Sequence, residues 1–168
     1  MRITKGVEWA AHACAMLAPL PKGSGLSAAS LAEYHDVPAA YMAKQMQALS
    51  RAKIVSTSRG TTGGYCLARS PAEISLWDIT AAVDGSEPAF KCEEIRQNGP
   101  CGAARADCKK ACPIAAGFAQ AEQAYRDVLK SIDLVQLLAM IGEGGPRDNT
   151  SKMMTWYGEN VTQLRSKP

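Results

Sequence analysis

The chain has 168 residues, of which 46% are hydrophobic, and a formal net charge of +3. That length buries one sizeable core and is too short for two independent average domains. Neither a signal peptide nor an apolar run of the roughly 20 residues that span a bilayer is evident, so we expect a cytoplasmic protein with no membrane partner.

The positive charge is concentrated in the N-terminal part. Residues 1–70 contain eight Lys or Arg against three acidic residues. A basic region is typical of proteins that bind a polyanion such as nucleic acid, but a solvated basic surface gives the same count. Charge by itself therefore leaves both interpretations open.

The first half of the chain predicts a helix-turn-helix. Apolar residues recur at helical spacing over residues 5–17, which predicts a first helix. Ser27 is placed to cap a second helix over residues 28–34, and residues 35–38 then form a tight turn. A third helix is expected over residues 38–52, opened by its proline.

The third helix is the predicted recognition helix. Met42, Met46 and Leu49 share one face, which we expect to be buried. The residues that we expect to contact DNA lie on the other faces: Tyr41, Lys44 and Gln45. In these positions Gln45 is suited to reading adenine, and Lys44 to contacting phosphate or guanine.

A pair of short strands follows and predicts a wing. Residues 54–57 and 65–68 have strand character, and the glycine-rich segment 58–64 that joins them contains Arg59. A helix-turn-helix followed by such a hairpin is the winged-helix arrangement, in which a wing arginine can enter the minor groove. We therefore expect a mainly α winged helix-turn-helix domain with a small β wing over residues 1–85, and Arg59 as its minor-groove contact.

Beyond the wing the sequence predicts a long helix. A fourth helix over residues 76–84 precedes the irregular segment 86–112, and Pro113 is placed to open a helix that continues to about Lys130. DNA-binding heads of this size usually act as two-fold dimers on paired half-sites, so we expect a dimerisation helix rather than one folded back on its own domain. Its apolar stripe consists of Ile114, Phe118, Ala121, Tyr125 and Val128 or Leu129.

The C-terminal segments are less regular. Ser131 is placed to cap a short last helix, so residues 113–140 form the predicted dimerisation region. Residues 141–168 are predicted to be a flexible tail, and Trp156 and Tyr157 indicate that this tail docks on the rest of the protein.

Four cysteines lie in or at the end of the irregular segment: Cys92, Cys101, Cys108 and Cys112. Structural disulfides are not expected in a reducing cytoplasm, which favours metal or redox chemistry. Zinc sites usually pair thiolates across two to four residues, so zinc would need partners distant from Cys108 and Cys112. The wide spacing of the four suits an iron-sulfur cluster better.

The surroundings of these thiols favour their ionised form. Lys109 and Lys110 are adjacent in sequence, and Cys112 stands at the predicted N-terminus of the long helix. The same surroundings would suit a thiol switch without a cluster, so this alternative remains open. Cys14 and Cys66 are expected to be small core residues.

Glu8 and His12 provide a second group of possible ligands. They lie four residues apart on the first helix, so they share a face and could chelate a metal jointly. Such a pair is usually only a surface contact, but a cluster with fewer than four thiolates must complete its coordination with imidazole or carboxylate. Trp9, next to Glu8, is then a candidate for the residue that moves when the ligation of Glu8 and His12 changes. The alternative is that Trp9 is simply a core residue.

Several motifs together resemble those of the Rrf2 family of bacterial regulators, over roughly residues 1–140. They are Glu8-Trp9 with His12, His35-Asp36-Val37, the segment 41–49, Gly63-Gly64-Tyr65, Val83-Asp84-Gly85 and the late cysteines. The similarity is strongest to iron-sulfur members of the RsrR type, through Glu8-Trp9, His12 and the segment 110–113. It implies a homodimeric repressor of a double-stranded DNA operator with an iron-sulfur cluster, 2Fe-2S favoured, between its subunits.

The resemblance also implies the ligands. One subunit would supply thiolates from Cys92, Cys108 and Cys112, and its partner would supply Glu8 and His12. Family members commonly have three late cysteines whereas this chain has four, so the resemblance leaves open which thiolates bind. Cys112 is favoured, together with Cys92 or Cys108.

Overall fold

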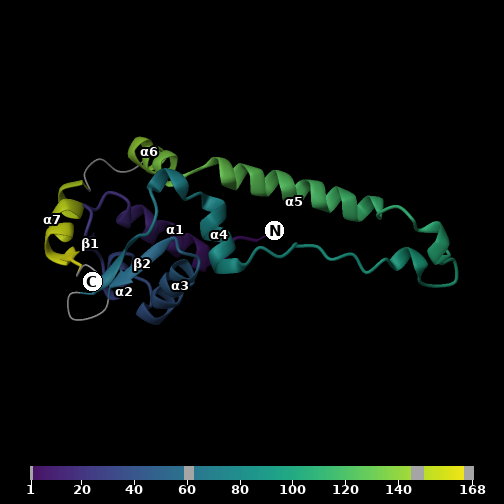
Figure 1. The fold of residues 1–168 in the computed structure, drawn as a ribbon, viewed down its shortest axis with the longest axis horizontal. Coiled ribbons are helices and arrows are strands. Elements are labelled where there is room, and N and C mark those ends of the chain that lie inside the picture. The colour runs from purple at the N-terminus through teal and green to yellow at the C-terminus, as the bar shows by residue number, and fades with distance from the viewer. Residues whose placement is uncertain (1, 59–62, 145–149, 165–168) are drawn as a thin grey trace.

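A computed structural model describes residues 2–58, 63–144 and 150–164, and these form a head and a long arm. The head contains the N-terminal helices, the wing and the C-terminal helix. The arm consists of one long helix and the segment that leads to it, and the two extend side by side away from the head (Figure 1).

Three helices form the predicted helix-turn-helix. Helix α1 spans Lys5–Leu17, α2 spans Ala28–Tyr34 and α3 spans Ala39–Arg51. The Ser27 hydroxyl accepts a hydrogen bond from the backbone N–H of Ser30 at 2.9 Å, which confirms the predicted cap of α2. The turn between α2 and α3 is tight, as predicted.

The core lies where α1, α2 and α3 meet helix α4, which spans Leu76–Asp84. The predicted buried face of α3 is confirmed. The largest fully buried side chains are Leu26, Leu31, Met42, Met46, Leu49, Ile54, Ile74, Ile79 and Leu134. They come from α2, α3, α4 and the connecting segments of the head, and from Leu134 in the helix that follows the arm, so that helix packs into the core of the head.

A two-stranded hairpin forms the wing. Strand β2 (Val55–Ser58) pairs antiparallel with β3 (Gly64–Leu67), in a register that places Val55 opposite Leu67. The wing is joined to the head because Leu26 and Tyr65 exchange backbone hydrogen bonds of 3.0 and 2.8 Å. Both predicted strands are therefore present, each shifted by one residue.

The arm is built on helix α5, which spans Pro113–Ser131. None of the side chains of this fully described helix is buried. Helix α6 (Leu134–Gly144) returns the chain to the head. The prediction that Ser131 caps this helix was wrong, because the Asp133 carboxylate accepts the hydrogen bond from the N–H of Gln136 at 2.8 Å.

Short 3-10 helices complete the described elements. Helix η1 (Pro71–Glu73) precedes α4, while η2 (Ile95–Gln97) and η3 (Arg105–Asp107) lie in the segment at the far end of the arm. Of the helices that the structure describes, none is both long and apolar enough to cross a membrane.

The C-terminal segment differs from the predicted flexible tail. Helix α7 spans Thr150–Asn160, and strand β4 (Thr162–Gln163) pairs antiparallel with β1 (Ser24–Gly25). The tail docks on the head through its aromatic residues, since the Tyr157 hydroxyl donates a 2.9 Å hydrogen bond to the backbone carbonyl oxygen of Met16.

Candidate functional site

Helix α3 offers an exposed surface for DNA. Lys44 is exposed, and Tyr41 keeps 57% of its surface open to solvent. The Tyr41 ring also meets the Trp9 ring of α1 edge-to-face, with centroids 6.0 Å apart. This half-buried tryptophan thus joins the first helix to the outer face of the recognition helix.

Gln45 does not belong to this surface, so the prediction that it lies on an exposed face of the recognition helix was wrong, and its role in reading adenine stays a prediction. Only 7% of the residue is exposed, and its amide is packed against α1 so closely that a Cβ at Gly6 would lie 3.0 Å from the amide nitrogen. Position 45 follows Met42 by three residues and precedes Leu49 by four, which places it on the buried stripe of α3.

The predicted wing contact, Arg59, lies outside the described residues. The strands that flank it are in place, and the hairpin has the position expected of a wing beside α3 (Figure 1). Arg59 therefore stays a prediction from the sequence.

Glu8 and His12 are both exposed on α1, as a pair of ligands in a shared site must be. The His12 ring lies 5.1 Å from that of His35, at the end of α2. Burial, together with the charge of His12, lowers the pKa of His35, and its Nε2 is buried with no hydrogen-bond partner among the described residues. His35 was missed as a neighbour of the site, although it is the only other histidine.

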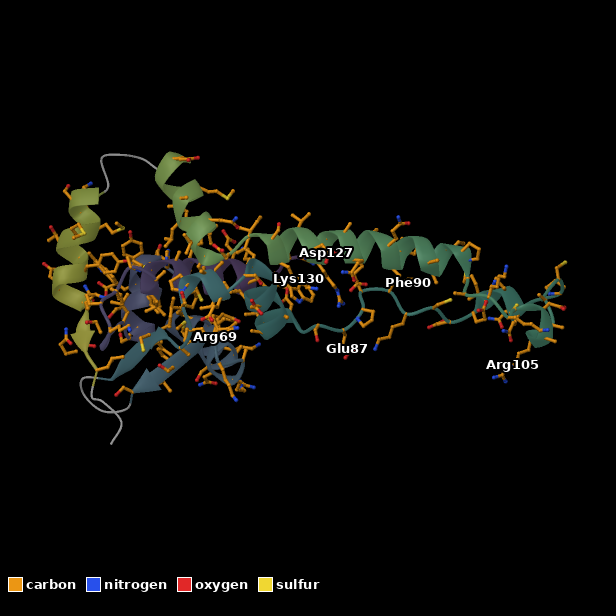
Figure 2. The ribbon with its side chains drawn as sticks, turned by 45° about the horizontal axis from the view of Figure 1, so that its top comes forward. Arg69, Glu87, Phe90, Arg105, Asp127 and Lys130 are labelled. Carbon is orange, nitrogen blue, oxygen red and sulfur yellow. The ribbon has the colours of Figure 1, made fainter. Side chains whose placement is uncertain are left out.

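The segment that carries the cysteines forms the far end of the arm, where Figure 2 labels Arg105. Cys92 and Cys101 are exposed, whereas Cys108 and Cys112 are half-buried, and all four are free thiols. The Cys92 sulfur accepts a hydrogen bond from the backbone N–H of Glu94 at 3.4 Å. The thiols are therefore accessible for ligation or oxidation.

Arg96 organises this cysteine-bearing end, and the sequence analysis missed it. Its guanidinium is paired with the Glu94 carboxylate, which lowers the pKa of Glu94, and donates a 3.0 Å hydrogen bond to the carbonyl oxygen of Lys110. The Arg96 carbonyl oxygen in turn accepts from the N–H of Ala103 at 2.8 Å. Three stretches of the loop are thus tied to one residue.

Cys112 is the thiol whose ionised form is best supported. Its pKa is lowered by hydrogen bonds from the backbone N–H groups of Ala115 and Ile114, in the first turn of α5, and by the positive charge of Arg96. The N-terminus of the long helix was predicted to favour the thiolate of Cys112, and these two backbone hydrogen bonds agree with that prediction. The cation that lowers the pKa of Cys112 is Arg96, and the predicted neighbouring lysines, Lys109 and Lys110, are not among the groups that shift it.

The remaining two cysteines differ from each other. Cys14 is fully buried in the core, as predicted, and burial raises the pKa of its thiol to about 12. Cys66 was also predicted to be a core residue, but it is only half-buried, with its sulfur 3.0 Å from the Ser56 hydroxyl on the opposite wing strand. The reason is that Cys66 is paired with the exposed Ser56, so its side chain lies on the face of the wing that is open to solvent.

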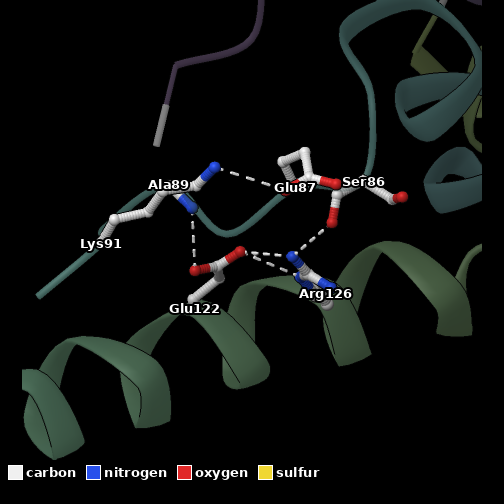
Figure 3. Close-up of polar contacts among 6 residues, drawn as sticks. All are labelled: Ser86, Glu87, Ala89, Lys91, Glu122 and Arg126. Atoms are coloured by element: carbon white, nitrogen blue, oxygen red, sulfur yellow. Dashed lines mark hydrogen bonds and ion pairs between the residues drawn. The ribbon is translucent and has the colours of Figure 1, made fainter.

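A clamp of Glu122 and Arg126 holds the segment that leads to the cysteines along α5 (Figure 3). The Glu122 carboxylate accepts from the N–H of Ala89 at 3.1 Å, and Arg126 donates to the carbonyl oxygen of Ser86 at 2.9 Å. The Arg126 guanidinium also lies 4.7 Å from the ring centre of Trp77 on α4. The clamp therefore connects the arm to the head.

A single subunit does not bring the two groups of candidate ligands together. Within residues 2–58, 63–144 and 150–164 there is no group of three or more His, Cys, Asp or Glu that could hold a metal ion. Glu8 and His12 lie on α1 in the head, whereas the segment that carries the thiols runs along the arm and forms its far end (Figure 1). The donor types fit an iron-sulfur cluster, but a complete site would need two subunits.

Comparison with known proteins gives a consistent result. Residues 3–140 match the Rrf2 family model, which is described as an iron-dependent transcriptional regulator. Protein slr0846 of Synechocystis, named as an HTH-type transcriptional regulator, is 37% identical over 90 residues, which are 54% of this chain and 61% of that protein. YwgB of Bacillus subtilis, named likewise, is 24% identical over 143 residues, which are 85% of this chain and 88% of YwgB. These names are those of regulators, not of enzymes.

Solved structures show the same fold. IscR of T. potens has a TM-score of 0.64 at 22% identity, over 87% of this chain and 92% of IscR. CymR, the global cysteine regulator of B. subtilis, has a TM-score of 0.63 at 21% identity, over 83% of this chain and 98% of CymR. The mainly α winged-helix fold expected from the sequence is confirmed.

Proposed function

Because the chain belongs to the Rrf2 family of transcriptional regulators, we propose that it is a homodimeric cytoplasmic repressor that senses redox state through an iron-sulfur cluster held between its subunits. The observation that carries the proposal is the separation of the candidate ligands. Thiols lie at the end of the arm and a carboxylate-imidazole pair lies on the head, so two subunits would complement each other.

The apolar surface of α5 supports a dimer. Its predicted stripe is open to solvent in the single chain, with Ile114 66%, Phe118 53% and Val128 60% exposed. Each large apolar side chain that a partner covers stabilises the dimer by roughly 1.5–3 kcal/mol. A partner helix lying against α5 would cover the stripe.

The ligands of the proposed cluster are Cys92, Cys108 and Cys112 with Glu8 and His12 of the other subunit, and a 2Fe-2S cluster would need two thiolates if both Glu8 and His12 bind. When bound, such a cluster supplies a centre that gains or loses one electron. The lowered pKa of Cys112 favours the thiolate that ligation requires.

Helix α1 is the proposed link from this site to DNA. Glu8 and His12 lie on the same helix as Trp9, whose ring contacts Tyr41 on the recognition helix. A change in the ligation of Glu8 and His12 would shift α1 and, through that ring contact, the spacing of the two recognition helices. DNA half-sites are about 34 Å apart, so a changed spacing weakens binding.

An absorption spectrum of protein purified without oxygen tests the cofactor, and operator titrations of its oxidised and reduced forms test the response. We expect visible absorption and at least a tenfold difference in affinity between the two forms, which equals about 1.4 kcal/mol. Colourless, metal-free protein with full operator affinity would refute the cluster.

The substitution His12→Ala tests the link. Because His12 is exposed on α1 and is not one of the residues proposed to contact DNA, the variant should still bind DNA but lose the difference between the oxidised and reduced forms. Lys5→Ala, an exposed change on the same helix, should keep that difference. An unchanged redox response in His12→Ala would contradict the proposed link.

A thiol switch without a cluster is the second candidate, and the environment of Cys112 favours it as well. A thiol with a lowered pKa beside Arg96 reacts readily with oxidants. The two candidates differ in metal-free protein, where a thiol oxidant would change DNA affinity only in the second case, and Cys112→Ser would abolish that change. Zinc in place of iron would be identified by metal analysis.

A further inference from the structure

The segment 150–164 lies beyond the 3–140 region that matches the family model, yet it contacts three parts of the head. The Tyr157 hydroxyl binds the carbonyl oxygen of Met16 at the end of α1. The Trp156 ring lies 4.7 Å from that of Tyr34, the last residue of α2. This segment, which we call the strap, therefore packs on both helices that precede the turn of the helix-turn-helix.

The end of the strap reaches the base of the wing. The N–H of Leu164 donates a hydrogen bond to the carbonyl oxygen of Gly23, and the Gln163 amide donates to the Ser24 hydroxyl at 3.0 Å. Strand β4 thereby adds to β1, and β1 leads directly into Leu26, which exchanges hydrogen bonds with the wing.

The Leu164 side chain packs against two glycines, and Gly25 makes room for it. A Cβ added at Gly25 would lie 2.8 Å from a Leu164 methyl carbon, and one added at Gly64, the first residue of β3, would lie 3.4 Å from its other methyl carbon. The leucine thus covers the point at which the first strand of the head meets the wing. The absence of a side chain at Gly25 permits this contact.

We propose that the strap fixes the wing to the helix-turn-helix and so raises the affinity of the protein for DNA. The wing is a hairpin of two four-residue strands, and an isolated two-stranded hairpin is only marginally stable in water. A wing that is already held in position loses less conformational entropy when it binds. The strap acts on DNA binding, which rests on the proposed function, and requires no cluster.

Point variants of the 168-residue chain test the strap. Leu164→Ala removes the contact with Gly25 and Gly64, and Leu164→Met retains most of it. Met154→Ala is the matched control, because Met154 is on the strap but 62% exposed. The probe is a labelled duplex that the wild-type protein selects from a random-sequence pool, titrated at several salt concentrations.

We expect Leu164→Ala to bind this duplex about tenfold more weakly, with a salt dependence less steep by about one phosphate contact. Backbone amides of β2 and β3 should exchange hydrogen faster, while those of α5 should not change. Met154→Ala and Leu164→Met should stay within about twofold of wild type. Unchanged affinity of Leu164→Ala would overturn the proposal, and so would tighter binding, which would make the strap an inhibitor.

A milder variant covers the case in which Leu164→Ala does not fold. Tyr157→Phe removes only the hydrogen bond to Met16 and keeps the ring in place, and it should weaken binding in the same direction by about two- to fivefold. Wild-type protein that selects no duplex would refute the proposed regulator itself. Normal selection with unchanged affinity of both strap variants would refute the strap alone.

Discussion

In the cysteine-bearing end of the arm, Arg96 couples loop geometry to thiol chemistry. The first N–H groups of α5 and, to a smaller extent, the charge of Arg96 lower the pKa of Cys112 from the ordinary value of 9.0. Thiolate therefore forms at lower pH than in an isolated cysteine. Removing the cation shifts this titration to higher pH, because only the helix terminus then stabilises the anion.

Arg96→Ala should accordingly slow the alkylation of Cys112 in metal-free protein at neutral pH and move its pH profile upward. Peptide mass spectrometry after timed alkylation measures this for each thiol. Arg105→Ala removes the same charge from an exposed site in the same segment and should leave the profile of Cys112 nearly unchanged. Equal effects of both variants would indicate general electrostatics rather than the specific contact.

Lys44 is the exposed cation in the middle of the recognition helix. If it contacts phosphate as proposed, Lys44→Ala should weaken binding to all duplexes alike and make the salt slope less steep by about one. Titrations at several salt concentrations measure both quantities. Lys152→Ala, an exposed lysine on α7, is the control and should not alter the slope.

At the scale of elements, α5 carries the prediction on assembly. Phe118→Ser exposes a polar group in the proposed interface and removes an aromatic contact with Phe90, whose ring is 4.8 Å away. Since a large apolar side chain contributes roughly 1.5–3 kcal/mol on burial, we expect dimerisation to weaken by at least tenfold. Sedimentation equilibrium measures it, with Gln120→Ala on another face of α5 as the control.

The clamp on α5 makes the attachment of the arm sensitive to acid. Arg126 lowers the pKa of Glu122 from the ordinary value of 4.5, so the carboxylate stabilises the fold above that pH. This stabilisation is lost as pH falls through the lowered pKa. Glu122→Gln should therefore reduce the melting temperature at pH 6 and flatten its fall between pH 5 and 3. Glu87→Gln, whose carboxylate is 83% exposed, should change neither.

Local sequence signals were sufficient for most elements, but for the strap they predicted only that it docks through Trp156 and Tyr157, and neither its helix nor its docking position. Helical periodicity, the Ser27 cap and Pro113 located the helices because each acts within one or two turns. Helix α7 docks through Tyr157 on Met16, more than a hundred residues earlier, and such a contact leaves no local pattern. The same reason applies to Arg96, whose partners lie in separate stretches of the loop.

The error on Gln45 has a different cause. Its spacing from Met42 and Leu49 placed it on the buried face, and this signal was present in the sequence. Its polarity outweighed the spacing in the prediction. In the structure, the small Gly6 on α1 leaves room for a long amide between the helices.

For the whole molecule, Leu134 anchors the chain that leaves the arm in the core of the head. Its side chain is fully buried in the head, and its N–H donates to the carbonyl oxygen of Ile74 at 2.9 Å, directly after the arm ends. Leu134→Ala should destabilise the protein by about 2–5 kcal/mol, the usual range for such a cavity. Chemical denaturation measures this. Val135→Ala, at the adjacent residue that is 52% exposed, should lower the free energy of unfolding by about 0.5 kcal/mol or less.

The length of the arm has a genetic consequence. Because thiols and imidazole would reach a shared centre from different polypeptides, defects in the two halves should complement each other. A homodimer of His12→Ala subunits and a homodimer of Cys112→Ala subunits would each show the same DNA affinity under oxidising and reducing conditions. Co-expressed, they would form mixed pairs in which one centre has every ligand intact, so the signal would return at half the normal occupancy.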